Sequence, residues 1–146
     1  MKIVSIMLTV ALVTCGAAAE CRAQRLVGWD DLVMRDGLWY EADSEIPFTG
    51  VAVEYRPGGQ KAAEIEIRYG IVEGKAVTWH ENGRKQSEGE LRNGREHGEW
   101  TFWHENGEVE AEIEYENGNV ISGEVWDERG YPENMYQVET ERIWVD

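Results

Sequence analysis

The feature that most constrains this chain is a repeat with a period of 24 residues. Gly74 and Gly98 open two copies of one frame: a glycine, a tryptophan five residues later, the run His-Glu-Asn-Gly, and then a second Asn-Gly pair. A more divergent copy precedes them from Gly50, and a shortened copy follows from Gly123, slightly out of phase. A constant period of this length indicates a repeat protein, in which each unit buries apolar surface against its neighbours.

Each copy is predicted to be one β-hairpin. The pairs Asn82-Gly83 and Asn106-Gly107 lie between stretches of alternating residues, where Asn and Gly accept the positive φ of a tight turn. In the second strands, apolar and charged residues alternate over 63–69 and again over 110–116, which predicts half-buried antiparallel strands. The middle copy keeps only Leu91 of the apolar set, so its second strand is predicted to be the weakest.

These patterns predict an all-β fold, a single-layer antiparallel sheet of tandem 24-residue hairpins. The repeats span 50–130, a lead-in and capping strand span 20–49, and a capping tail spans 131–146. A short strand or helical turn from the lead-in should pack over the first hairpin. Ile143 to Val145 should either pair as a final edge strand or lie over the end of the sheet.

The positions that define the repeat frame are expected to be structural. They are Gly50, Tyr55, Gly59, Gly74, Trp79, Gly83, Gly98, Trp103, Gly107, Gly123, Trp126 and Gly130. Among them, Tyr55, Trp79 and Trp103 occupy a single repeat position. Aromatic rings dominate the buried area of small β domains, so this row is expected to form the core of the sheet. A platform that binds carbohydrate or peptide is the other interpretation.

Acidic residues also recur with the period. The chain carries a formal net charge of −15, and much of it belongs to three pairs that project from the second strands. These pairs are Glu64 and Glu66, Glu88 and Glu90, and Glu112 and Glu114. They form either a solvated face that keeps a β protein soluble or a surface that docks a basic protein partner. Nucleic acid and anionic membranes are poor candidates for binding, because this charge repels both.

Little in the sequence indicates catalysis or a cofactor. His80 and His104 share one repeat position, which is explained more simply by copying of the unit than by a metal site. Evenly spaced glutamates lack the convergent loop of a calcium site. There is no Gly-x-Ser-x-Gly elbow, phosphate-binding loop or Cys/His pairing for a nucleophile. We therefore expect no metal, no cofactor and no enzymatic activity.

Residues 1–19 have the pattern of a signal peptide. Lys2 precedes an apolar run, and Ala17 to Ala19 form a small-residue cleavage site, which predicts export to the periplasm or beyond the cell. The stretch ending at Cys15 also resembles a lipobox, so attachment to the outer membrane through a lipid on Cys15 is an alternative, as is a retained anchor. Cys21 then lies either near the new N-terminus or in a lipid tether.

The repeat frame resembles a known family. A glycine, four residues, Tyr or Trp, then x-x-x-Gly, and an Asn-Gly or Tyr-Gly about eleven residues later resembles the MORN repeat. The similarity is to the bacterial variant found in proteins classed as YwqK-type antitoxins, and the lead-in residues 35–40 and 47–50 resemble that family too. The resemblance covers about residues 32–130. It implies an interaction surface and an antitoxin or immunity role, in which an acidic face covers the basic active surface of a toxin.

A protein of the cell envelope with a structural or glycan-binding role is the rival expectation. Its contact surface would be the tryptophans Trp79, Trp100, Trp103 and Trp126. Buried tryptophan rings favour docking through the acidic face, whereas an exposed row of rings favours the glycan.

Overall fold

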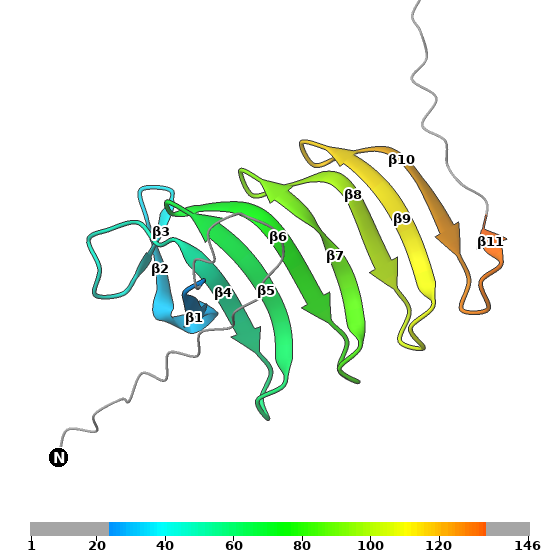
Figure 1. The fold of residues 1–146 in the computed structure, drawn as a ribbon, viewed down its shortest axis with the longest axis horizontal. Helices are drawn as coiled ribbons and strands as arrows, with labels where there is room; N and C mark the ends of the chain where they lie inside the picture. The colour runs from blue at the N-terminus through cyan, green and yellow to red at the C-terminus, as the bar shows by residue number, and fades with distance from the viewer. Residues whose placement is uncertain (1–23, 134–146) are drawn as a thin grey trace, which may run out of the picture.

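The protein folds into one long, open β-sheet (Figure 1), in a computed structural model that describes residues 24–133. Its nine strands, in spatial order, are β1 (Leu26–Gly28), β4 (Gly50–Tyr55), β5 (Lys61–Arg68), β6 (Ile71–Trp79), β7 (Lys85–Arg92), β8 (Arg95–Trp103), β9 (Val109–Glu116), β10 (Asn119–Trp126) and β11 (Pro132–Glu133). From β4 onwards every neighbouring pair is antiparallel, which confirms the predicted sheet of tandem hairpins. The exception is β1, which pairs with β4 in parallel.

At one end of the strands, four turns of five residues each connect neighbouring strands. We call these four turns the turn row. They span 56–60, 80–84, 104–108 and 127–131, and each is closed by the same two backbone hydrogen bonds. In the second turn, His80 N–H donates to Arg84 O at 2.9 Å and Gly83 N–H donates to His80 O at 3.0 Å. The expected positive φ occurs at Gly83 (83°) but not at Asn82, because this turn is longer than a two-residue hairpin loop.

The two-residue loops lie at the opposite ends of the strands. They are Tyr69-Gly70, Asn93-Gly94 and Asn117-Gly118, and both residues of each have positive φ. Tyr69 was expected to continue the apolar side of its strand. It instead begins the loop, since β5 ends at Arg68, and its side chain is 77% exposed.

The N-terminal segment covers the first hairpin, as the lead-in was expected to do. It contains a 3-10 turn, η1 (Trp29–Asp31), and a separate hairpin of β2 (Leu32–Arg35) and β3 (Leu38–Glu41). Leu32 and Phe48 pack on Ala52 and Ile67 in a buried hydrophobic core cluster. These elements lie together at one end of the sheet (Figure 1). The predicted signal peptide, Cys15, Cys21 and the 143–145 segment lie outside the described residues.

Between β7 and β8, the large and the small side chain of a facing pair have changed strands relative to the preceding copy. Ile65 of β5 lies opposite Ala76 of β6. One period later the corresponding residues are Gly89 and Trp100, and the buried Trp100 indole lies directly against Gly89. The Trp100 Nε1–H donates to Glu90 O at 3.0 Å, which satisfies the polar atom of the buried ring. The small residues of the middle strand therefore make room for a tryptophan.

The shift in phase of the last copy arises at a β-bulge. Between Ile65 and Ile67 of β5, the partner strand β6 contributes two extra residues, and β8 does the same against β7. Against β9, strand β10 contributes only one extra residue, between Val120 and Ser122. The last copy is therefore one residue shorter, and Trp126 and Gly130 follow Trp103 and Gly107 by 23 residues. Gly123 follows Trp100 by the same 23 residues, so it takes the place of Trp100 and not that of Gly98.

Candidate functional site

The first three turns of the turn row are each hydrogen-bonded to the next hairpin along the sheet. His80 Nε2 lies 2.6 Å from the carbonyl oxygen of Trp103. Asn82 Nδ2 donates to the carbonyl oxygen of Glu105 at 2.8 Å. The histidine and the asparagine of the repeated His-Glu-Asn-Gly run thus connect neighbouring hairpins, and the asparagine also accepts the backbone N–H of Arg84 within its own turn at 2.9 Å.

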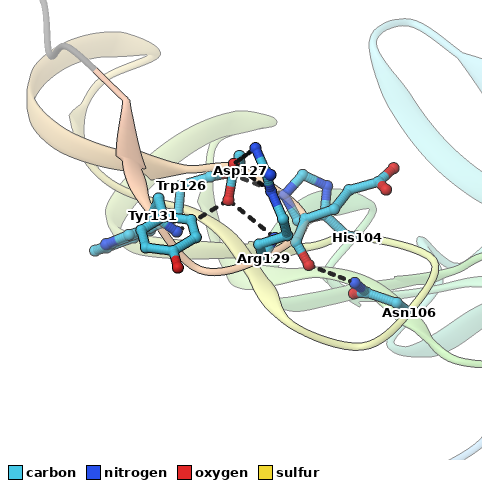
Figure 2. A network of polar contacts seen from close by, with 7 residues as sticks. His104, Asn106, Trp126, Asp127, Arg129 and Tyr131 are labelled. Atoms are coloured by element: carbon cyan, nitrogen blue, oxygen red, sulfur yellow. Dashed lines mark hydrogen bonds and ion pairs between the residues drawn. The ribbon is translucent and has the colours of Figure 1, made fainter.

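The following copy repeats both bonds, as Figure 2 shows. His104 Nε2 lies 2.9 Å from Trp126 O, and Asn106 Nδ2 donates to Glu128 O at 2.7 Å. The repeated histidines therefore have a structural role. Within residues 24–133, no group of three or more His, Cys, Asp or Glu side chains is arranged to hold a metal ion.

The last turn replaces both connecting residues. Asp127 stands where the histidines stand, and its carboxylate accepts the backbone N–H groups of Tyr131 and Arg129, each at 2.9 Å (Figure 2). The hydrogen bond from Tyr131 N–H is the main cause of the lowered pKa of Asp127, and the hydrogen bonds from Arg129 lower this pKa further. The Arg129 guanidinium also folds back onto Asp127 at 3.1 Å. These two side chains bond within their own turn.

Removal of one connecting side chain should cost a measurable part of the stability. We expect Asn106→Ala to lower the free energy of unfolding by about 1–2 kcal/mol, because the bond to Glu128 and the bond from Glu108 N–H are both lost. Arg129→Ala, at the matching place in the last turn, removes no bond between turns and should cost less. Urea denaturation followed by tryptophan fluorescence measures both. Equal losses would contradict the role of the connection.

The six predicted glutamates project from one side of the sheet, which we call the glutamate face. The strand register places Glu64, Val77, Glu88, Thr101, Glu112 and Glu124 in one continuous cross-strand row from β5 to β10. Glu66, Glu90 and Glu114 each follow two residues later on their strands, so they share the face. The structure thus brings the predicted glutamates together.

The aromatic row lies on the same glutamate face. Trp79 and Trp103 follow Val77 and Thr101 by two residues, and Trp103 lines a depression of about 440 Å³ with Glu88 and Glu90. Tyr55 is 57% exposed and the two tryptophans are half-buried, so the expectation that this row forms the core was wrong. The buried residues belong mainly to β4, to the opposite face and to the N-terminal segment. Trp100, proposed for the glycan surface, is buried on that opposite face.

Lysine and arginine side chains pair with the glutamates in the N-terminal half of the glutamate face. Lys61 pairs with Glu64, and Arg68 pairs with Glu66 at 3.2 Å. Lys75 and Lys85 both pair with Glu88, the carboxylate at the centre of the row. Hydrogen bonds from Lys75 and then from Lys85 are the main causes that lower the pKa of Glu88. These glutamates already have cationic partners within the chain.

The C-terminal half of this face, over β7 to β10, carries unpaired acid. Among the described residues, no lysine or arginine nitrogen lies within 4.0 Å of the carboxylates of Glu90, Glu99, Glu112, Glu114 and Glu124. Glu99 lies directly opposite Glu114, and Glu112 lies directly opposite Glu124. Like charges in such positions destabilise a sheet. We call Glu99, Glu112, Glu114 and Glu124 the acidic quartet, and they line a depression of about 240 Å³.

Sequence reasoning missed Glu99 and Glu124, which belong to first strands of the repeat. A signal for Glu99 was present, because Lys75 stands one period earlier and the charge therefore reverses at that position. Glu124 was hidden by the shorter last copy.

The geometry defines a class: an open-sheet repeat protein built from tandem β-hairpins. Within it, residues 96–121, which run from β8 through β9 into β10, match the MORN repeat variant family. That match indicates a repeat module of the kind that serves in protein interaction. The comparisons with curated proteins and with solved structures gave no match. No helix within residues 24–133 has the length and apolar character needed to cross a membrane.

Proposed function

We propose that this protein is a non-catalytic, extracytoplasmic interaction module that binds a basic protein partner through its acidic quartet. The observation that carries the proposal is the two pairs of opposed glutamates, Glu99 with Glu114 and Glu112 with Glu124, none of which has a lysine or arginine nitrogen within 4.0 Å among the described residues. If this face served only to keep the protein soluble, pairing of its glutamates with lysines, as found over β5 to β7, would give a more stable sheet.

Binding of a basic surface would relieve a cost that the free protein bears. Lysine or arginine side chains placed between the quartet carboxylates replace repulsion with attraction. The field of the whole chain, with its net charge of −15, also speeds encounter with a positively charged partner. Both effects weaken as salt is added, because the interacting groups are exposed.

The proposal includes an antitoxin or immunity role, on the strength of the family resemblance. The partner would then be a toxin whose basic active surface is covered by the acidic quartet. Because the N-terminal residues predict export, with lipid attachment through Cys15 as the alternative, such a toxin must act outside the cytoplasm or cross the periplasm.

A glycan is the second candidate ligand. The observation in its favour is that half-buried Trp103 lines the same depression as Glu88, Glu90 and Glu99, so aromatic and acidic groups converge on one surface. Stacking of a sugar on these rings would change little with ionic strength.

The acidic quartet is tested by removing the same number of negative charges at two different places. One variant carries Gln at Glu99, Glu112, Glu114 and Glu124, and the control carries Gln at the exposed turn residues Glu81, Glu105, Glu108 and Glu128. Both lose four negative charges. We expect the quartet variant to lose a basic partner that the parent and the control recover from the native cell envelope, and we expect this recovery to fall steeply with salt.

Two results would overturn the proposal. Equal loss in both variants would show that only the net charge matters. Recovery of cell-wall glycan by all three proteins, with no dependence on salt, would favour the glycan and remove the antitoxin role.

A further inference from the structure

The glutamate face contains the same lysine site twice. Lys61, at the start of β5, pairs with Glu64 three residues later, and its Nζ lies 5.2 Å from the centre of the Trp79 ring. One period on, Lys85 pairs with Glu88 in the same way, and its Nζ lies 5.1 Å from the centre of the Trp103 ring. In each case a carboxylate and an aromatic face hold one ammonium group.

The third copy keeps the walls of this site and lacks its lysine. Glu112 stands one period after Glu88, and Trp126 takes the place of Trp103, since the histidine of the preceding turn bonds its carbonyl oxygen at 2.9 Å. Val109 lies opposite Trp103 just as Lys85 lies opposite Trp79. A shorter, uncharged side chain therefore occupies the position from which the lysine reached across.

The second cation of the earlier site is also absent. Lys75, which pairs with Glu88 from β6, is replaced one period later by Glu99. Glu112 therefore has neither of the two lysines that contact Glu88, and it faces Glu124 instead. Two substitutions in the same repeat unit thus convert a filled cation site into an unfilled one.

We propose that Glu112 and Trp126 bind a lysine side chain of a partner protein, whose ammonium group takes the place that Lys61 and Lys85 take in the first two copies. This inference rests on the proposed function and deepens it, because it gives the acidic quartet a defined anchor point. The ammonium nitrogen contacts the Glu112 carboxylate and lies over the Trp126 ring. Glu124 and Glu99 add attraction for neighbouring basic residues of the same partner.

The site can be filled from within the chain. Val109→Lys restores the lysine of the first two copies, so the new side chain should occupy the site and exclude a ligand. Val120→Lys is the matched control: it makes the same exchange on the opposite face, where Val120 lies opposite Tyr115. The probe is a capped peptide, acetyl-Lys-Gly-Lys-Gly-Lys-amide, titrated into the full chain while the indole N–H signal of Trp126 is followed by NMR. That signal is assigned with Trp126→Phe.

The parent and Val120→Lys should bind the peptide with a shift of the Trp126 signal, and Val109→Lys should bind it about tenfold more weakly. A converse variant carries Lys75→Glu with Lys85→Val and so gives the second copy the residues of the third. It should gain a second peptide site, with a shift of the Trp103 indole signal. Unchanged binding in Val109→Lys, or no second site in the converse variant, would overturn the lysine site.

The outcomes also separate this inference from the function beneath it. If the peptide or the native partner binds Val109→Lys as it binds the parent, but the quartet variant loses it, the acidic quartet stands and the lysine site falls. If the quartet variant also keeps its partner and the peptide, both are wrong.

Discussion

Replacement of Gly89 by isoleucine should destabilise the protein by about 3 kcal/mol, and its combination with Trp100→Ala should cost about 2–3 kcal/mol less than the sum of the two single losses. A Cβ atom on Gly89 would overlap the Trp100 indole, so the single variant must displace a buried ring. Trp100→Ala alone empties the same space and should cost about 3–5 kcal/mol. The double variant recreates the Ile65 and Ala76 pair one period later.

The measurement is a double-mutant cycle in urea, with all four proteins followed by circular dichroism. We expect a favourable coupling of about 2–3 kcal/mol between the two positions, because each substitution corrects the volume error of the other. Gly89→Ile combined with Phe102→Ala is the control, since Phe102 lies two residues further along β8. Additive losses in the main cycle would refute the exchange of volume.

Truncation of Ile67 should have the next largest effect, a loss of about 2–5 kcal/mol for Ile67→Ala. Ile67 is 1% exposed and joins the sheet to Leu32 and Phe48 of the N-terminal segment. Leu91 occupies the same position one period later but is only half-buried. Leu91→Ala should therefore cost clearly less.

The two truncations are compared by thermal and urea denaturation. The N-terminal segment supplies a second readout, because Trp29 packs against Trp39 with ring centres 4.9 Å apart. Ile67→Ala should loosen this pair and change the near-UV circular dichroism, whereas Leu91→Ala should not. Similar losses at both sites would mean that the N-terminal segment adds little to the stability of the sheet.

Much of the fold was predictable, because the repeat states its structure several times over. Period-two alternation over 63–69 and 110–116 predicted strands, and the Asn-Gly pairs predicted the turns between them. The lead-in was correctly expected to cover the first hairpin. The parallel pairing of β1 with β4 was not foreseen, because Leu26 meets Val51 through a long-range contact that no local pattern encodes.

Which face each residue occupies was harder to predict. A change of one residue in the length of a turn moves every later side chain to the other side of the sheet. The five-residue turn 80–84 puts Trp79 on the same side as Glu88, a result that alternation within either strand alone does not give. The expectation that the aromatic row forms the core was therefore wrong. Acidic and aromatic residues share one face, so the test that set docking through an acidic face against docking through an aromatic face does not apply.

The candidate site was predictable in part. Two glutamates of the acidic quartet, Glu112 and Glu114, follow from periodicity, but the pairing that divides the face depends on lysines from other strands. Lys75 and Lys85 reach the Glu88 carboxylate from β6 and from within β7, and only the register shows that they converge. The replacement of Lys85 by Val109 is visible in the sequence, yet it acquires meaning only when Trp103 is seen beside the ammonium group.

The turn row gives the repeat array a direction of growth. The histidine and the asparagine of each internal turn bond to carbonyl oxygens of the hairpin that follows. A copy duplicated in frame within the array would therefore have both the donors and the acceptors for these bonds. In the last turn, Asp127 and Arg129 bond within the turn, so neither side chain is placed to donate to a copy appended after it. Lineages that lengthen this protein should therefore insert whole 24-residue units upstream of Asp127 and preserve the same final turn.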